Sequence, residues 1–263
     1  MPTVVLASGT AWVVPHGVTQ LDSVECWGGG APGNQNGEDI GSGGAGAYAR
    51  TNNLPVTPNQ TCYYRIPAQR SPGAADPEDT WFNKDANQAP TSTSQGCLAK
   101  SGKKSTGQNG GPGGLASQCI GDVAYNGGNG NYSALAGNRG GSGGGGAASN
   151  QGAGNAGATT TSSTGANGGA AGTGGGAGGT GGPSGGGGNG SPGTSDEDGG
   201  GGGGGGGGHN LTNPGAGGDG GTPGGGGGQA GCGGAGNRND VGGDGARGQI
   251  RITYRYATKA VVC

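Results

Sequence analysis

Ten consecutive glycines, Gly199–Gly208, constrain this chain more than any other feature of its sequence. Glycine loses more backbone freedom on folding than any other residue, and it brings no side chain to a core. Such a run is either a flexible linker or a material in which backbones pack directly against one another. The residues around the run favour one of these alternatives.

Glycine is concentrated in one part of the chain. Residues Gly137–Gly248 hold 55 glycines in 112 positions, and the other 151 residues hold the remaining 23 of 78. Hydrophobic residues make up only 27%, which is too little apolar area for one core along the whole length. Only 11% of the residues are charged, whereas a disordered tail usually stays soluble through high net charge.

The spacing of the other residues favours a folded glycine-rich section. Non-glycines recur every third position at Ala177, Thr180 and Pro183, and again in two further sets: Asn213, Ala216, Asp219 and Thr222, and Gln229, Cys232 and Ala235. Three residues per turn is the period of the polyproline II helix, whose backbone groups point outward. A linker needs no such period, and collagen needs glycine at every third position with abundant proline. We therefore expect several glycine helices to lie side by side, with lateral hydrogen bonds of about 1 kcal/mol each offsetting the entropy cost.

The two ends of the chain are predicted to form strands. In Gln249–Ala257, apolar residues at even positions (Ile250, Ile252, Tyr254, Tyr256) alternate with polar ones, as in a half-buried strand. Further candidates are Thr3–Ala7, Ala11–Pro15, Val18–Trp27 and Thr61–Ile66, with weaker signals at Ala47–Thr51 and Gly121–Tyr125. No segment has a helical period.

These observations predict a mainly β and irregular fold with essentially no α-helix: a small β-sandwich built from both termini, with an inserted bundle of polyglycine II helices. We divide the chain into N-terminal sandwich strands (1–67), a loop-rich insertion (68–136), the glycine bundle (137–248), and a closing strand with a tail (249–263).

Charge and hydropathy exclude several classes of partner. The net charge of −2 offers no attraction to nucleic acid, and no apolar stretch approaches the roughly 20 residues of a membrane span. The start, MPTVVLASGTAWVV, lacks the basic region of a secretory signal.

We predict no catalytic, cofactor or metal site. The sequence has no G-x-S-x-G or H-E-x-x-H motif, and its only histidines are His16 and His209. The acidic cluster Ser195–Asp198 is expected to be a solvated turn rather than a calcium loop.

The six cysteines leave two alternatives open, disulfides or buried free thiols. They are spread along the chain with no C-x-x-C pair, at Cys26, Cys62, Cys97, Cys119, Cys232 and Cys263.

Four aromatic residues are candidates for receptor binding. Aromatics make up only 4% of the chain, and loop aromatics are common contact residues, so we single out Trp81, Phe82, Tyr125 and Tyr132. The alternative is that these side chains fill small cores beneath loops.

The order of these regions resembles a family of glycine-rich domains found in bacteriophage virion proteins, mostly tail and tail-fibre components, and in some bacterial surface proteins. The resemblance is carried by Trp12–Gly33 (WVVPHGVTQLDSVECWGGGAPG), Gly41–Ile66 (GSGGAGAYARTNNLPVTPNQTCYYRI) and Gly242–Tyr254 (GGDGARGQIRITY). In architecture the chain is also similar to the polyglycine II adhesins at the tips of T-even-type long tail fibres.

The resemblance implies a non-enzymatic virion structural protein, assembled in the host cytoplasm, with host-recognition loops on a polyglycine II scaffold. Its expected partners are other virion proteins of the tail fibre, tail or capsid, and a host cell-surface protein or glycan. We expect an oligomer or part of a larger assembly, without nucleic acid or membrane insertion. The alternatives are a capsid decoration, a filament-forming protein without receptor specificity, and a bacterial surface protein.

Overall fold

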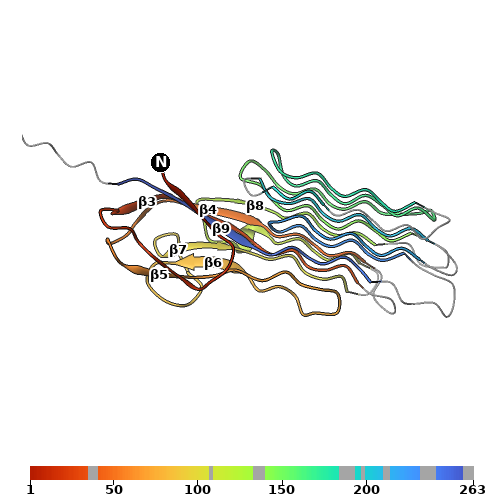
Figure 1. Cartoon of the computed structure of the whole chain (residues 1–263), viewed down its shortest axis with the longest axis horizontal. Coiled ribbons are helices and arrows are strands. Elements are labelled where there is room, and N and C mark those ends of the chain that lie inside the picture. Colours follow the sequence, from red (N-terminus) through yellow and green to blue (C-terminus); the bar gives the residue numbers. More distant parts are fainter. Residues whose placement is uncertain are drawn as a thin grey trace, which may run out of the picture.

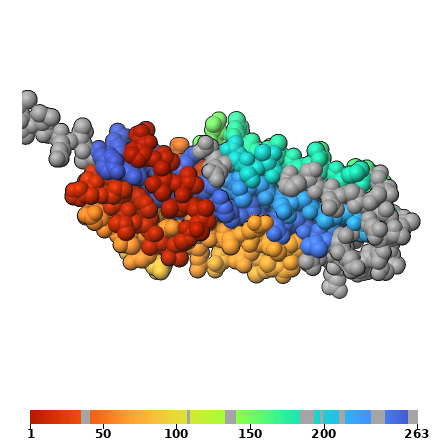
Figure 2. Space-filling model, in the orientation of Figure 1, coloured from red at the N-terminus to blue at the C-terminus, as the bar shows by residue number. Residues whose placement is uncertain are grey.

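The computed structural model describes residues 1–34, 41–106, 109–132, 140–183, 193–196, 199–209, 214–231 and 241–256. This part of the chain is mainly β, and its helical content is a single short 3-10 turn, η1 (Ala116–Gln118). The strands gather at one end of an elongated molecule, and wavy extended segments run side by side at the other end (Figure 1). Figure 2 shows the N-terminal residues, in red, on the surface of the strand end, with teal and blue segments beside one another farther along.

The described residues contain nine strands in two antiparallel sheets. One sheet has the order β1-β9-β3-β4-β8 and the other has the order β2-β5-β6-β7. The strand bounds are β1 Thr3–Leu6, β2 Ala11–Val13, β3 Gln20–Trp27, β4 Tyr48–Pro55, β5 Thr61–Arg65, β6 Thr80–Asn83, β7 Gly96–Ala99, β8 Val123–Tyr125 and β9 Gln249–Tyr254.

The two termini meet in the five-stranded sheet, as predicted. Strand β9 lies between β1 and β3, with Ile252 opposite Val4 and Ile250 opposite Cys26. The predicted apolar face of this strand is buried at Ile250, Ile252 and Tyr254, while Tyr256 lies beyond the strand end and is 55% exposed.

A single apolar core lies between the two sheets. Alternate residues of each strand point into it, which is why the end segments alternate in sequence. Its buried members include Val24 and Cys26 from β3, Phe82 from β6 and Ile250 from β9.

The prediction that residues 68–136 form a loop-rich insertion is wrong for β6 and β7, whereas β8 lies within the weaker strand candidate Gly121–Tyr125. Strands β6 and β7 complete the four-stranded sheet, and β8 is an edge strand of the other sheet. Every residue of β6 and β7 is buried, so neither strand has the alternation of apolar and polar residues by which strands are recognised.

Five strands continue directly into glycine-containing segments, so the glycine-rich part of the fold is wider than residues 137–248. Segments 28–34, 100–106 and 126–132 follow β3, β7 and β8, and segments 41–47 and 241–248 lead into β4 and β9. These segments, together with 109–115 and the described residues between 140 and 240, are called the glycine region below.

The ten-glycine run lies at the centre of the glycine region. Residues 200–208 are buried, and their backbone groups are hydrogen-bonded to six neighbouring segments of the chain. The N–H groups of Gly201–Gly204, Gly206 and Gly207 bond to carbonyls in 166–169, at 194 and in 223–229. The carbonyls of residues 200–208 accept N–H groups from 141–147, 176–182 and 215–221. A flexible linker would make no such lateral bonds.

These hydrogen bonds repeat every third residue. Gly201, Gly204 and Gly207 donate to Pro223, Gly226 and Gln229, at 2.8, 2.9 and 3.0 Å. The carbonyls of Gly201, Gly204 and Gly207 accept the N–H groups of Ala147, Gly144 and Gly141, on a segment that runs in the opposite direction. Successive residues therefore bond to different neighbours, and every third residue returns to the same one.

Solvent exposure in the outer segments follows the same spacing. The predicted outward residues Ala177, Thr180 and Pro183 are exposed, while Gly176, Gly179 and Gly182 are buried. Of the second predicted set, Asp219 is exposed, and Ala216 and Thr222 are half-buried.

The third set does not follow the prediction at Gln229. This side chain is buried, and its Oε1 accepts hydrogen bonds from the backbone N and the Oγ of Ser142, at 3.2 and 2.9 Å. A long polar side chain fits inside because a buried serine on the neighbouring segment satisfies it. Asn213, Cys232 and Ala235 lie outside the described residues.

Candidate functional site

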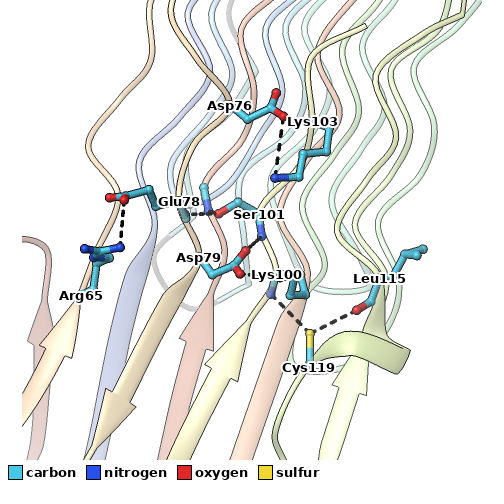
Figure 3. Close-up of polar contacts among 10 residues, drawn as sticks. Arg65, Asp76, Glu78, Asp79, Lys100, Ser101, Lys103, Leu115 and Cys119 are labelled. Atoms are coloured by element: carbon cyan, nitrogen blue, oxygen red, sulfur yellow. Dashed lines mark hydrogen bonds and ion pairs between the residues drawn. The ribbon is translucent and has the colours of Figure 1, made fainter. Parts of the chain in front are cut away.

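A cluster of charged side chains lies where the four-stranded sheet passes into the glycine region (Figure 3). Two carboxylates three residues apart, Asp76 and Asp79, face two lysines with the same spacing, Lys103 and Lys100. The Lys100–Asp79 pair is close, at 2.5 Å and about three-quarters buried, whereas the Lys103–Asp76 pair is loose, at 3.8 Å. We call these four residues the junction cluster.

The carboxylates of the junction cluster also accept backbone hydrogen bonds. Asp79 Oδ1 accepts the N–H of Ser101 at 3.0 Å, and Asp76 Oδ1 accepts the N–H of Lys104 at 2.9 Å. Ser101 Oγ in turn donates to the carbonyl of Glu78 and accepts the N–H of Gly29, at 2.6 and 2.8 Å. The junction cluster therefore connects the segment that precedes β6 to segments 28–34 and 100–106 of the glycine region.

A pocket of about 290 Å³ opens beside the junction cluster. It is lined by Arg65, Pro77, Glu78, Asp79, Trp81, Ala89 and Lys103. Arg65 and Glu78 form a half-exposed ion pair at 2.9 Å, and Trp81, only 6% exposed, contributes to the wall. The volume is at the small end of ligand pockets, and charges of both signs suit a small polar group.

The structure does not bring the four predicted binding residues together. Trp81 lines the pocket, and Tyr132 is 43% exposed, seven residues beyond the end of β8 along the glycine region. Phe82 lies in the sandwich core beside Trp12, with ring centroids 6.4 Å apart. Tyr125 is half-buried and stacks on Tyr48, with centroids 6.2 Å apart.

For Phe82 and Tyr125 the alternative applies, because both rings are packed against apolar neighbours, although in strands rather than beneath loops. Both belong to strands, and the sheet geometry directs their rings onto apolar neighbours. Trp81 is also a strand residue, and it keeps only a small exposed edge.

A second apolar cluster, not anticipated from the sequence, lies on the outer face of the five-stranded sheet. It contains Trp27, Tyr48 and Ala148, so a turn of the glycine region covers this face. Arg251 makes a bidentate ion pair with Glu25, at 2.7 and 3.0 Å, and its guanidinium lies 5.2 Å from the Trp27 ring centroid.

Tyr48 completes this network by donating its hydroxyl to Glu25 at 2.6 Å. Burial, followed by the charge of Glu25 and this hydrogen bond, raises the pKa of Tyr48 above its usual value. Proximity of the two charges was not visible in the sequence, because residues 25 and 251 come together only when β9 pairs with β3.

The four described cysteines are free thiols, so the free-thiol alternative holds for Cys26, Cys62, Cys97 and Cys119. Burial raises the pKa of Cys26, and it raises the pKa of Cys62 to about 12 and that of Cys119 to about 11. A thiol with so high a pKa is a weak nucleophile at neutral pH. Cys232 and Cys263 lie outside the described residues.

Within the described residues, no three His, Cys, Asp or Glu side chains come together as a metal site, and no helix is long and apolar enough to cross a membrane. His209 is buried, and its backbone N–H bonds to the carbonyl of Ser163 at 2.8 Å. Asp196 accepts the N–H of Gly199 in a turn at 3.0 Å, and the rest of the acidic cluster, Glu197 and Asp198, is outside the described residues.

The comparison with protein-family models gave no match, and no curated protein matched the chain. The geometry of the glycine region is therefore the main evidence on the function of this protein.

Proposed function

We propose that this protein is a non-enzymatic structural component of a bacteriophage virion, part of a tail or tail fibre, in which a bundle of polyglycine II helices supports a host-binding end. One observation carries the proposal: a buried run of ten glycines is hydrogen-bonded to six neighbouring segments. A region in which backbones are joined laterally in this way suits a stiff support.

The polyglycine II assignment is supported by the backbone itself. Hydrogen bonds that rotate among neighbours with a period of three match a helix with three residues per turn. In the described part of the glycine region, left-handed φ values occur only at Gly174, Gly200 and Gly224. All three lie beside turns at the sandwich end, so the straight passes keep the negative φ that this helix requires.

A bundle of this kind is a natural spacer. At ~3.1 Å per residue, a pass of eight residues spans roughly 25 Å. Hydrogen bonds in six lateral directions resist bending, whereas a single extended chain does not. Each glycine segment that continues from a strand is fixed at one end by the sandwich. The opposite end of the bundle therefore lies at a fixed distance from the sandwich.

We propose that the end away from the sandwich contacts a host cell-surface protein or glycan, with Tyr132 among the contact residues. Tyr132 continues the exposed row that begins at Asn126 and Asn129, and it is the described exposed aromatic farthest from the strands along that row. Trp81 is the secondary candidate because it lines the junction pocket. The sandwich end would attach to other virion proteins.

The virion assignment is tested with an antibody raised against the purified protein. Phage particles purified from the source culture should bind the antibody at discrete positions under the electron microscope. Particles that lack the antigen by both microscopy and mass spectrometry would rule out the virion role.

The binding end is tested separately with Tyr132→Ala and a matched control, Tyr256→Ala, which changes an exposed tyrosine at the sandwich end. Tyr132→Ala should lower binding of the purified protein to host cells at least tenfold, and Tyr256→Ala should leave binding unchanged. Equal binding by both variants would remove Tyr132 from the contact surface.

A further inference from the structure

Two outward backbone N–H groups at the boundary of the glycine region are satisfied by side chains. Segments 109–115 and 126–132 are neighbours, because Gly127 and Gly130 donate to the carbonyls of Gly114 and Gly111. In the reverse direction, the N–H of Gly113 bonds to Asn129 Oδ1 at 2.8 Å, and the N–H of Ala116 bonds to Asn126 Oδ1 at 2.7 Å.

The same arrangement recurs at other outer pairs of segments. Gly165 and Gly168 donate to Gly182 and Gly179, while the N–H of Gly181 bonds to Asn167 Oδ1 at 2.9 Å. Elsewhere, Asp219 Oδ1 accepts the N–H of Asp244 at 2.8 Å. The junction cluster repeats it with Asp76 and Asp79, which accept from Lys104 and Ser101.

Inside the glycine region, the backbone carbonyls of a third segment accept such N–H groups. The N–H of Gly114, next to Gly113, bonds inward to the carbonyl of Ala45 at 2.9 Å, and Gly111 bonds to Ser42 in the same way. An asparagine or aspartate oxygen at the boundary thus replaces the carbonyl of a missing neighbour. Interior segments approach too closely for a Cβ, so the side chain of such a residue also keeps a further segment at a distance.

We propose that Asn126, Asn129 and Asn167 terminate the lateral hydrogen-bond network, and that without them a glycine segment from a second copy of this chain docks against the outer segments at these positions. Only a backbone nearly free of side chains can approach closely enough, and without the asparagine side chains the outer segment 126–130 of the second copy is such a backbone, since residues 127, 128 and 130 are already glycine. The second copy could dock with its segment in either chain direction, since residues 200–208 bond to both parallel and antiparallel neighbours. A net charge of only −2 gives little repulsion between copies. The inference does not depend on the virion role.

The test is sedimentation velocity of the full chain carrying Asn126→Gly and Asn129→Gly. These changes keep the main-chain carbonyls that accept from Gly154 and Gly157, and they remove only the side chains. We expect species of at least twice the wild-type mass, increasing with protein concentration. The matched control, Asn126→Asp with Asn129→Asp, keeps an acceptor oxygen and adds charge, so it should sediment as the wild type does.

Identical sedimentation of the glycine variant and the wild type at every concentration would overturn the proposal. If the double variant does not fold, Asn167→Gly alone tests the same point on the other outer pair of segments. The expectation for that variant is again a concentration-dependent gain in mass, and unchanged mass again counts against the proposal.

Discussion

The carbonyl oxygen of Gly218 occupies the place where a Cβ on Gly204 would lie. Gly201 and Gly207 stand in the same relation to the carbonyls of Gly221 and Gly215, three residues to either side. The absence of side chains in the ten-glycine run is thus a packing requirement: backbones from neighbouring segments lie where side chains would be.

Replacing Gly204 with alanine should destabilise the protein strongly. The new methyl group collides with backbone, which must move and lengthen the hydrogen bonds of Gly204 to Gly226 and Gly144. Overpacking and lost hydrogen bonds together should reduce the free energy of unfolding by about 3 kcal/mol or more. Urea denaturation measures the loss. Thr180→Ala, at an exposed position of an outer segment, is the control and should change little. Equal stability of the two variants would mean that the run is not closely packed.

The ion pair between Glu25 and Arg251 should contribute far more to stability than the one between Arg65 and Glu78. The side chains of the first pair are 6% and 13% exposed, and those of the second are 49% and 54% exposed. Removing one member of a buried pair leaves an uncompensated charge and costs about 3–5 kcal/mol, whereas an exposed pair contributes about 0–1 kcal/mol.

This difference is measured with Arg251→Met and Arg65→Met in the same denaturation assay. Arg251→Met should lower stability several-fold more, and adding Glu25→Gln should restore part of the loss because the unpaired carboxylate is then neutral. Similar effects of the two single variants would contradict the account of the outer-face network.

Stability should fall at alkaline pH, beginning near pH 9. Burial raises the pKa of Cys62 to about 12 and of Cys119 to about 11, from 9.0, and it also raises the pKa of Tyr48. Between these values the unfolded chain loses protons that the folded chain keeps, so the unfolded state is favoured as pH rises. The stabilising effect is complete below pH 9 and is lost as pH approaches 12. Thermal melts from pH 7 to 11 should show a constant Tm at first and a decline above pH 9, which Cys62→Ala should make shallower. A Tm that stays constant to pH 11 would contradict the burial of these groups.

The terminal strands could be predicted because apolar residues that face the core alternate in them with residues that face away from it. Alternation at Ile250, Ile252 and Tyr254 reflects directly which side of β9 packs on the core. Alternation does not predict strands β6 and β7, because polar residues such as Thr80 and Asn83 are buried beside Trp81 and Phe82. Their pattern carries no signal of which face is solvated.

The three-residue spacing was recognised only in the section richest in glycine, although it extends beyond it. Asn126, Asn129 and Tyr132 are exposed with the same spacing, although they lie in the predicted loop-rich insertion (68–136). Composition set the predicted boundary, whereas the spacing would have placed this segment in the glycine region. The junction cluster was not predictable in this way, because the pairing of Asp76 and Asp79 with Lys103 and Lys100 depends on which segments become neighbours.

Amide hydrogen exchange across residues 199–208 tests the central claim most directly. Lateral hydrogen bonds predict that the amides of Gly201–Gly204, Gly206 and Gly207 exchange only when the whole protein unfolds, as slowly as those of β3 and β9. Exchange of the ten glycines within seconds, at the rate of a free glycine peptide while the sandwich strands stay protected, would show that the run is a linker and not a structural core.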